Sequence, residues 1–310
     1  MHRFTHRNST GWQPFWAALF AALLVLLPLV GGTALLSRQR LRTQLRQAAQ
    51  SKSSIPIRLP ETTDRLTVLL CAAGEQPGFL LLYLNAAQNS VELLALPAEL
   101  TVSFADAPAT LADCYAAAGP ARCRQALAEC LPLPEDTRYL AVSAAVLEQL
   151  AQRYGPVRVS FSGALSAAEL AQYRRTATVQ GISAAEAHDF FCAMDAEGTV
   201  PPAHRAAARG AVWEAFFRQN LDLLPTTLPG GLRSVSSVLL TDLTAQDYLH
   251  LERTLEFLAN NAASVRAQAL PGEWDPTAGT YALTEDSLAA VQTFFRVSPT
   301  VEHASSDSEP

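Results

Sequence analysis

Few residues of this chain have the types and spacing that chemistry requires. His188 and His204 are candidates for acid–base work, because imidazole titrates near neutral pH. Neither has a partner at motif spacing, so we interpret both as ordinary polar positions. The sequence contains no GxSxG, Walker, HExxH or GxGxxG pattern. These residues alone therefore indicate no particular reaction.

The chain has five cysteines, at Cys71, Cys114, Cys123, Cys130 and Cys192. None lies in a CxxC pattern or a His-rich cluster, so we expect no zinc site. Cys123 and Cys130 are seven residues apart on a predicted helix, about 10 Å, which is too far for a disulfide. Cys114 could meet Cys123 across the turn at Gly119-Pro120 if the domain lies outside the cell. The interpretation that we favour is that all five are small, buried apolar residues.

Charge is divided unevenly along the 310 residues. The first 52 residues hold seven basic and no acidic side chains, whereas the rest hold 16 basic and 29 acidic ones, a net charge of −13. An acidic domain repels the phosphates of nucleic acids. We therefore expect no nucleic-acid partner.

Residues 15–36 form an uncharged apolar run, FWAALFAALLVLLPLVGGTALL. Twenty-two residues at 1.5 Å each reach about 33 Å, enough to cross the hydrocarbon core of a bilayer. A cleaved signal peptide is the alternative, but the run is long for one and no convincing cleavage site follows it. We predict a transmembrane helix at 15–36, preceded by a short basic tail at 1–14 and followed by a juxtamembrane linker at 37–60.

The remaining sequence predicts an α/β fold. Three short apolar runs at 66–71, 79–84 and 91–96 are separated by turn residues, as in consecutive strands. Strands and helices then alternate irregularly, which favours a single domain at 61–296 with a mixed sheet flanked by helices. The acidic, polar residues 297–310 are predicted to be disordered. Further strands are expected at 137–142, 157–161 and 265–270, and helices at 110–134 with a break at Gly119-Pro120, 143–154, 183–196, 201–219, after Thr241 with Asp242 as N-cap, and 285–295.

Several segments resemble the LytR-CpsA-Psr family of cell-envelope proteins. The third strand ends in Leu96-Pro97-Ala98-Glu99, and QGISAAEA at 180–187 and ALPGEWDPTAGTY at 269–281 are similar to later family segments. The resemblance covers residues 62–296. It implies a mixed sheet and helices that sandwich a polyprenyl chain, in a single-pass membrane protein with its domain outside the cell. The basic residues that follow the apolar run favour the opposite orientation by charge alone.

The resemblance also implies an activity. Family enzymes are similar to phosphotransferases that move a glycopolymer from a polyprenyl-pyrophosphate carrier onto peptidoglycan, with a divalent metal, usually Mg²⁺, at the pyrophosphate. The family's metal-binding aspartate falls at Pro77, with Glu75 two residues earlier. Its arginine after the third strand falls at Ala98, and the next aspartate at Glu99. Glu75 and Glu99 are therefore the candidate metal ligands, since carboxylate oxygens suit Mg²⁺.

The cationic positions of the family are also changed. Its paired arginines fall within residues 190–193, which here are Phe-Phe-Cys-Ala. Arg205 matches the first arginine of the family's Arg-x-x-Arg segment, the second falls at Ala208, and Arg209 lies one place late. Arg205 and Arg209 are thus the candidate anion or pyrophosphate site. The alternative is that both lie on a solvated helix face.

Three functions remain open. The one that we favour is a membrane-bound, non-catalytic relative, a pseudoenzyme without an expected cofactor that binds a polyprenyl phosphate lipid or an envelope-assembly partner. The second is an active, Mg²⁺-dependent glycopolymer–peptidoglycan phosphotransferase that works with Glu75, Glu99, Arg205 and Arg209. The third is a structural or regulatory interaction module without a ligand, which would have a filled core.

Overall fold

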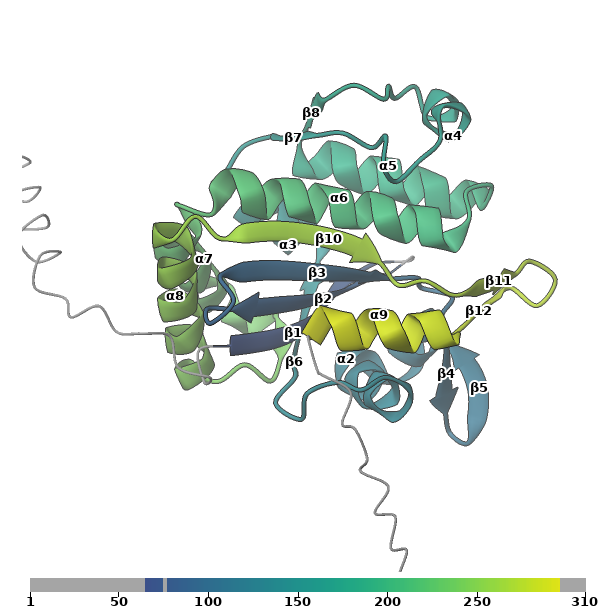
Figure 1. The fold of residues 1–310 in the computed structure, drawn as a ribbon, viewed down its shortest axis with the longest axis horizontal. Helices are drawn as coiled ribbons and strands as arrows, with labels where there is room; N and C mark the ends of the chain where they lie inside the picture. The colour runs from purple at the N-terminus through teal and green to yellow at the C-terminus, as the bar shows by residue number, and fades with distance from the viewer. Residues whose placement is uncertain (1–64, 75–76, 296–310) are drawn as a thin grey trace, which may run out of the picture. The chain divides into compact units, whose positions relative to one another are not determined.

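The computed structural model describes residues 65–74 and 77–295, which all belong to one compact unit. Its centre is a six-stranded sheet in the order β10-β3-β2-β1-β6-β9 (Figure 1). Strands β10, β3, β1 and β6 run in one direction, while β2 and β9 run against their neighbours. The strand bounds are β1 Arg65–Ala73, β2 Gly78–Asn85, β3 Ser90–Leu96, β6 Arg138–Ser143, β9 Leu240–Thr241 and β10 Ser264–Ala269.

The first three strands form the middle of this sheet, as the apolar runs predicted. Helices cover both of its faces, so side chains pointing either way are buried and the strands are continuously apolar. Leu80, Leu82 and Leu93 face one side, and Leu81 and Leu94 face the other. These strand predictions are confirmed.

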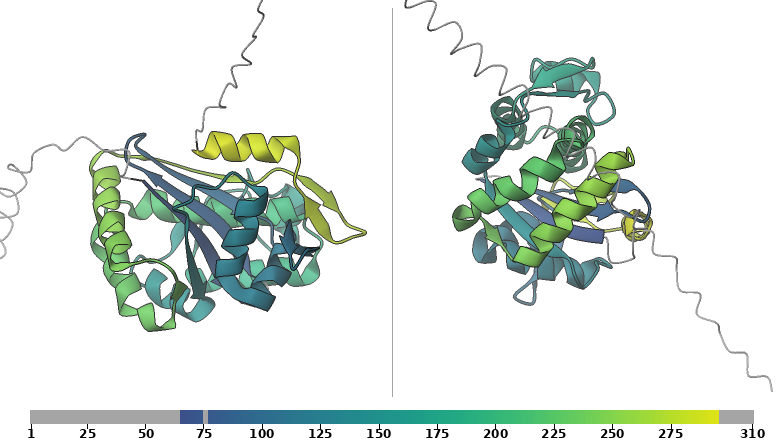
Figure 2. Two further views of the ribbon diagram at one scale, coloured as in Figure 1. Left: turned by 90° about the horizontal axis from the view of Figure 1, so that it is seen from below. Right: turned by 90° about the vertical axis from the view of Figure 1, so that its left-hand side faces the viewer.

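The two sheet faces carry different helices (Figures 1 and 2). The first face packs against α3 (Ala144–Ala151), α6 (Pro202–Asn220), α7 (Leu224–Ser234) and α8 (Ala245–Asn260), and the second against α2 (Leu111–Cys130) and α9 (Glu285–Phe295). Each face is closed by its own apolar cluster. The predicted mixed sheet flanked by helices is therefore confirmed for the described residues.

Helix α2 is bent where the sequence predicted a break. Gly119 has a φ of 73°, and Pro120 follows it. Before α2, strands β4 (Thr101–Phe104) and β5 (Ala107–Thr110) form a hairpin that we did not predict. Its two turn residues, Ala105 and Asp106, have positive φ angles of 50° and 62°. Tight turns of this kind usually carry Asn-Gly or Asp-Gly, so the usual signal is missing.

A smaller unit packs on the outer side of α6. It contains β7 (Val157–Val159), β8 (Gln180–Ile182), α4 (Ala167–Gln172) and α5 (Ala184–Glu197), around a third apolar cluster. The strand that we predicted at 157–161 exists as β7, but it pairs with β8 and stays outside the central sheet. Residues 236–238 form a short 3₁₀ helix, η1, and β11 (Glu273–Asp275) and β12 (Thr280–Ala282) form a separate hairpin.

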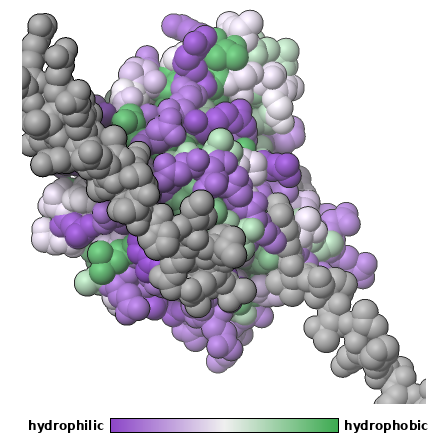
Figure 3. All heavy atoms as spheres, turned by 60° about the vertical axis from the view of Figure 1, so that its left-hand side comes forward, coloured by the Kyte–Doolittle hydropathy of each residue, from purple (hydrophilic) through white to green (hydrophobic). Residues whose placement is uncertain are grey.

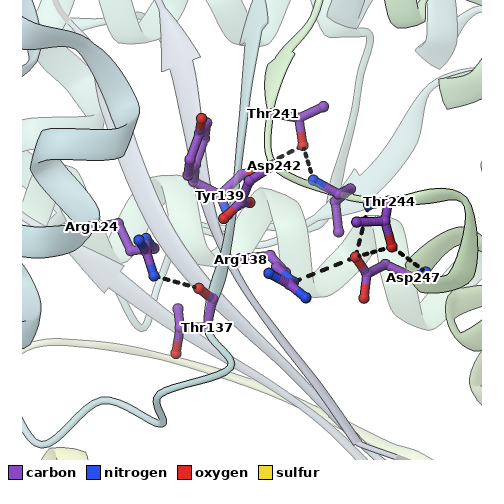
Figure 4. Close-up of polar contacts among 9 residues, drawn as sticks. Arg124, Thr137, Arg138, Tyr139, Thr241, Asp242, Thr244 and Asp247 are labelled. Carbon is purple, nitrogen blue, oxygen red and sulfur yellow. Dashed lines mark hydrogen bonds and ion pairs between the residues drawn. The ribbon is translucent and has the colours of Figure 1, made fainter.

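The prediction of Asp242 as the N-cap of α8 is wrong. Thr244 is the N-cap, and it forms a reciprocal capping box with Asp247. Asp242 instead accepts a hydrogen bond of 2.7 Å from the backbone N–H of Tyr139 (Figure 4). The Arg138 Nε atom lies 3.4 Å from Asp247 in the same group. We call these residues the β6–α8 cluster, because they join strand β6 to the start of α8.

All five cysteines lie among the described residues, and no disulfide joins them. Cys71, Cys114 and Cys123 are buried, as we expected, whereas Cys130 is half-buried and Cys192 is exposed. The prediction of five buried cysteines is therefore wrong for Cys192, which lies on the solvent side of α5. The predicted transmembrane helix at 15–36 lies outside the described residues. Within residues 65–74 and 77–295, no helix has the length and apolar character needed to cross a bilayer.

Candidate functional site

The candidate residues gather beyond the carboxyl ends of the parallel strands. In open α/β sheets this is the edge where ligands bind. Strand β3 leads through Pro97 to Glu99, and the first turns of α6 carry Arg205 and Arg209. Helix α6 lies close to the sheet at Gly210, where a Cβ atom would be 3.4 Å from the Cβ of Ala95. This close packing fixes the start of α6 beside the end of β3.

Four charged side chains meet there in a chain of ion pairs. Glu99 accepts a hydrogen bond from the Arg205 guanidinium. The other side of that guanidinium lies 3.4 Å from Asp195 of α5, and Asp195 also accepts a hydrogen bond from Arg209. We call these four residues the carboxyl-end cluster. Its two positive and two negative charges cancel.

Burial gives these pairs their energetic weight. The exposed fraction of the side chain is 8% for Arg205 and 7% for Asp195, and it is 17% for Arg209. Burial raises the pKa of Asp195 above its ordinary value, and the Arg209 and Arg205 guanidiniums offset part of that shift. Removing one partner from such a group leaves an uncompensated charge away from water. The cluster is therefore a closed structural unit.

Packing also restrains the Arg209 side chain. Its guanidinium lies over the ring of Phe191, 5.1 Å from the ring centroid. At Gly78, the first residue of β2, a Cβ atom would come within 3.3 Å of Arg209 Cδ and Nε. The aliphatic stem thus lies between α5 and the start of β2. Arg209 is held in its pair with Asp195 by contacts on two sides.

The structure contradicts one of our two interpretations of the arginines. The solvated helix face is wrong, because Arg205 is buried and Arg209 is mostly buried. Both guanidiniums are also engaged by carboxylates. Sequence reasoning missed Asp195 altogether. It directly follows the buried Met194 on the inward side of α5, and that position was the signal that could have found it.

The other family positions contribute no charge to the cluster. Ala208 is fully buried in the apolar cluster of the smaller unit, and Pro77 is buried beside β2. The Ala98 carbonyl accepts a hydrogen bond of 2.9 Å from the N–H of Ala112. Glu75 lies outside the described residues. The site is therefore formed by Glu99, Arg205 and Arg209 from the predicted set, with Asp195 added.

The described residues do not fit a magnesium site. Mg²⁺ requires several oxygen ligands in a near-octahedral arrangement. Glu99 and Asp195 are the carboxylates of the cluster, and each already accepts from an arginine. Within 65–74 and 77–295, no group of three or more His, Cys, Asp or Glu side chains is arranged to hold a metal. We derive no reaction step through Mg²⁺.

The two histidines make local contacts. His204 Nδ1 lies 2.8 Å from the Glu169 carboxylate at the start of α4. Burial alone would raise the pKa of the Glu169 carboxyl. Hydrogen bonds from Ser166 and His204 lower it by more, so the net pKa is below the ordinary value. His188 lies one helical turn before Cys192, with 3.7 Å between Nε2 and Sγ. These contacts agree with our interpretation of both histidines as ordinary polar positions.

Apolar side chains pack between the sheet and the helices on both faces. Apolar clusters close both sheet faces and the smaller unit. Among the surface cavities over the described residues, one of about 350 Å³ lies beside Arg175 and Phe190, and one of about 220 Å³ lies beside Glu92 and Arg266. Both are lined by a mixture of polar and apolar side chains, and neither is an apolar tunnel. The face in Figure 3 is mainly hydrophilic, with small separate hydrophobic areas.

No protein-family model matches this sequence, and no curated protein sequence matches it significantly. Solved structures do match. A putative transcription regulator from Eubacterium siraeum aligns with a TM-score of 0.61 and 14% identity, over 78% of this chain and 95% of that chain. TagT of B. subtilis, a LytR-CpsA-Psr enzyme, aligns with a TM-score of 0.57 and 17% identity, over 78% and 96%. TagT bound to LIIa-WTA gives the same TM-score and identity.

At such low sequence identity, these similarities establish the fold alone. The described residues have a LytR-CpsA-Psr-like fold, which confirms the architecture that the sequence resemblance implied. The low identity agrees with a divergent sequence on that fold. The charged residues at the carboxyl-end cluster must therefore be interpreted from their own geometry.

Proposed function

We propose that this chain is a membrane-anchored cell-envelope protein whose LytR-CpsA-Psr-like domain is non-catalytic and docks onto an envelope-assembly partner. The observation that carries the proposal is the carboxyl-end cluster. There Glu99 and Asp195 neutralise both arginines that would otherwise receive a pyrophosphate. The described domain keeps the fold, and both arginines at the expected place are paired with carboxylates.

Phosphoryl transfer depends on charge neutralisation by arginines and metal ions. A pyrophosphate entering this site would have to displace carboxylates that are already paired. Each charge-assisted hydrogen bond contributes about 1.5–3 kcal/mol. Replacing the carboxylate bonds of the arginines by pyrophosphate bonds of similar strength therefore yields little net binding free energy. The incoming anion would also meet the negative charge of Glu99 and Asp195. Tight pyrophosphate binding is therefore not expected.

The packed apolar clusters on both sheet faces favour a protein partner over a lipid. A polyprenyl chain needs an elongated apolar cavity, and both sheet faces of the described domain are closed by packed side chains. The apolar run at 15–36 would anchor the chain, with the domain on the outer side of the membrane. Peptidoglycan is a further candidate partner at that location.

The second candidate is an active phosphotransferase. Its support is the position of Arg205 and Arg209 at the carboxyl edge of the sheet, on a fold shared with TagT. In that case a substrate would have to open the carboxyl-end cluster. Arg205→Ala is a poor test of this function, because it would leave Glu99 and Asp195 without a buried partner and destabilise the fold.

Mass spectrometry of lipids tests the proposal. The full-length protein is extracted in detergent with and without added Mg²⁺, and its bound lipids are identified. We expect no stoichiometric polyprenyl phosphate or pyrophosphate in either condition, and no Mg²⁺-dependent cleavage of added polyprenyl pyrophosphate. A bound polyprenyl phosphate, or measurable cleavage, would contradict the proposal and favour the transferase.

A further inference from the structure

Helix α2 brings two cysteines together by its bend. In a straight helix, residues nine positions apart would lie about 13.5 Å from each other along the axis. At Gly119 the backbone turns with a φ of 73°, and the segment after Pro120 changes direction. Cys114 before the bend and Cys123 after it are both fully buried. Both belong to the same apolar cluster, and each thiol contributes to the pKa shift of the other.

We propose that Cys114 and Cys123 are a disulfide-forming pair that closes the bend of α2. Two buried cysteines on the two arms of a bent helix can reach the short separation that a disulfide requires, which a straight helix would not allow. Cys123 also makes a contact of 3.7 Å from Sγ to the Leu111 carbonyl, which orients its side chain toward the first half of α2. In the cell the bond also requires an oxidising compartment, so this part of the inference rests on the outer location in the proposed function.

The surroundings determine when the bond forms. Burial raises the pKa of both thiols, so little thiolate exists in the folded domain. Oxidation therefore takes place during folding, before the second sheet face is closed. After closure, the same burial keeps reductants away from the sulfur atoms.

The chemistry is a thiol–disulfide exchange with a small disulfide such as oxidised glutathione. The Cys123 thiolate attacks one sulfur of glutathione disulfide and releases one glutathione thiol. The Cys114 thiolate then attacks Cys123 in the mixed disulfide and releases the second thiol. The two cysteines lose two electrons and two protons in total, and one glutathione disulfide becomes two thiols.

Cys71 is the competing partner. Cys71 is buried in the same apolar cluster, and a negative charge on its thiolate would raise the pKa of the Cys123 thiol. Burial raises the pKa of Cys71 to about 12. It comes from β1 on the sheet, however, whereas Cys114 and Cys123 are joined by a short segment of α2. A short loop favours the local pair during folding.

The test is refolding of the full-length chain, in detergent, with reduced and oxidised glutathione. Thiols are then alkylated and counted in denaturant, and linked peptides are identified by mass spectrometry. We expect three alkylated cysteines and a Cys114–Cys123 link. Five alkylated cysteines, or a link that involves Cys71, would overturn the proposal.

Stability measurements distinguish a Cys114–Cys123 disulfide from two buried thiols that only pack in the core. In the chain-entropy description, closing a loop of this length lowers the unfolding equilibrium constant about a hundredfold. We expect this difference between oxidised and reduced wild-type protein, and also in Cys130→Ala, a half-buried control on the same helix. Cys114→Ala should remove it. A difference that persists in folded Cys114→Ala would contradict the assignment.

Discussion

The carboxyl-end cluster and the β6–α8 cluster use the same types of residue in different surroundings. In the first, Arg205, Asp195 and Arg209 contact one another almost entirely away from water. In the second, Asp242 accepts from a backbone N–H, and the pair of Arg138 and Asp247 is more open, with 36% of the arginine side chain exposed (Figure 4). The contribution of an arginine–carboxylate contact to stability depends on how deeply the pair is buried and on what else each group contacts.

The largest effect is expected for Asp195→Ala. The substitution removes the carboxylate oxygens that accept from Arg209 and lie beside Arg205, so both arginines lose their shared partner. We expect a loss of about 3–5 kcal/mol in the free energy of unfolding. Denaturant unfolding measures it, with Asp247→Ala in the open cluster as the matched control. Equal losses in the two variants would remove the distinction between the clusters.

Glu99→Gln should reduce stability less than the Asp195 substitution does, and it should strengthen anion binding. It replaces one charge-assisted hydrogen bond by a neutral one, and we expect a loss of about 1.5–3 kcal/mol. The cluster then has a net positive charge, so the affinity for inorganic pyrophosphate should rise about tenfold or more. Calorimetric titration of wild type and variant measures it. Unchanged affinity would show that charge cancellation is not what closes the site.

Asp242→Ala tests the backbone contact of the β6–α8 cluster. The variant leaves the N–H of Tyr139 without its carboxylate acceptor at the sheet edge. We expect a loss of about 1–2 kcal/mol, because the bond is charge-assisted but only partly buried. Hydrogen exchange at the Tyr139 amide should accelerate in parallel. A protected amide in the variant would mean that another group accepts its hydrogen bond.

The pH dependence of stability should report on Asp195. Because the pKa of Asp195 is raised in the folded state, the native protein binds its proton more tightly than the unfolded chain does. Its contribution to stability is therefore largest below the ordinary carboxyl value of 3.8 and declines as pH rises through the raised value. The slope is at most about 1.4 kcal/mol per pH unit. Unfolding curves of wild type minus Asp195→Asn across this window should show that sign.

Arg138→Gln is expected to have the smallest effect. Its ion pair with Asp247 is 3.4 Å long and partly solvated, and Thr244 already engages the same carboxylate. We expect a change below about 1 kcal/mol, reduced further by salt. Thermal unfolding at low and high ionic strength measures it. A loss comparable to that of Asp195→Ala would show that exposure is a poor guide to these pairs.

Sequence patterns predicted most of the fold, because they follow from burial. The meander of β1, β2 and β3, the bend at Gly119 and the final helix each depend on local apolar spacing or on one special residue. The β4–β5 hairpin was missed because its turn uses Ala105 and Asp106 in place of glycine. The cap of α8 was misplaced by two residues, since both Asp242 and Thr244 are suitable capping types.

The candidate site was less predictable than the fold. The sequence pointed to Glu99, Arg205 and Arg209, but it gave no reason to join Asp195 to them. The contact between Glu99 and Arg205 spans 106 positions of the chain. Such a pairing depends on where the first turns of α6 lie against the end of β3. That placement follows from the packing at Gly210, which no local pattern describes.

The sequence by itself determined the α/β class, the order of the main elements and the absence of most family charges, because these are properties of local composition and spacing. Only the tertiary structure decided what the remaining charges do. Packing α5 and α6 beyond the sheet brings Glu99 against Arg205 and Asp195 against both arginines, and it buries most of the surface of these side chains. Charges that are surrounded by solvent can bind a ligand, whereas charges that are buried with their partners serve the fold.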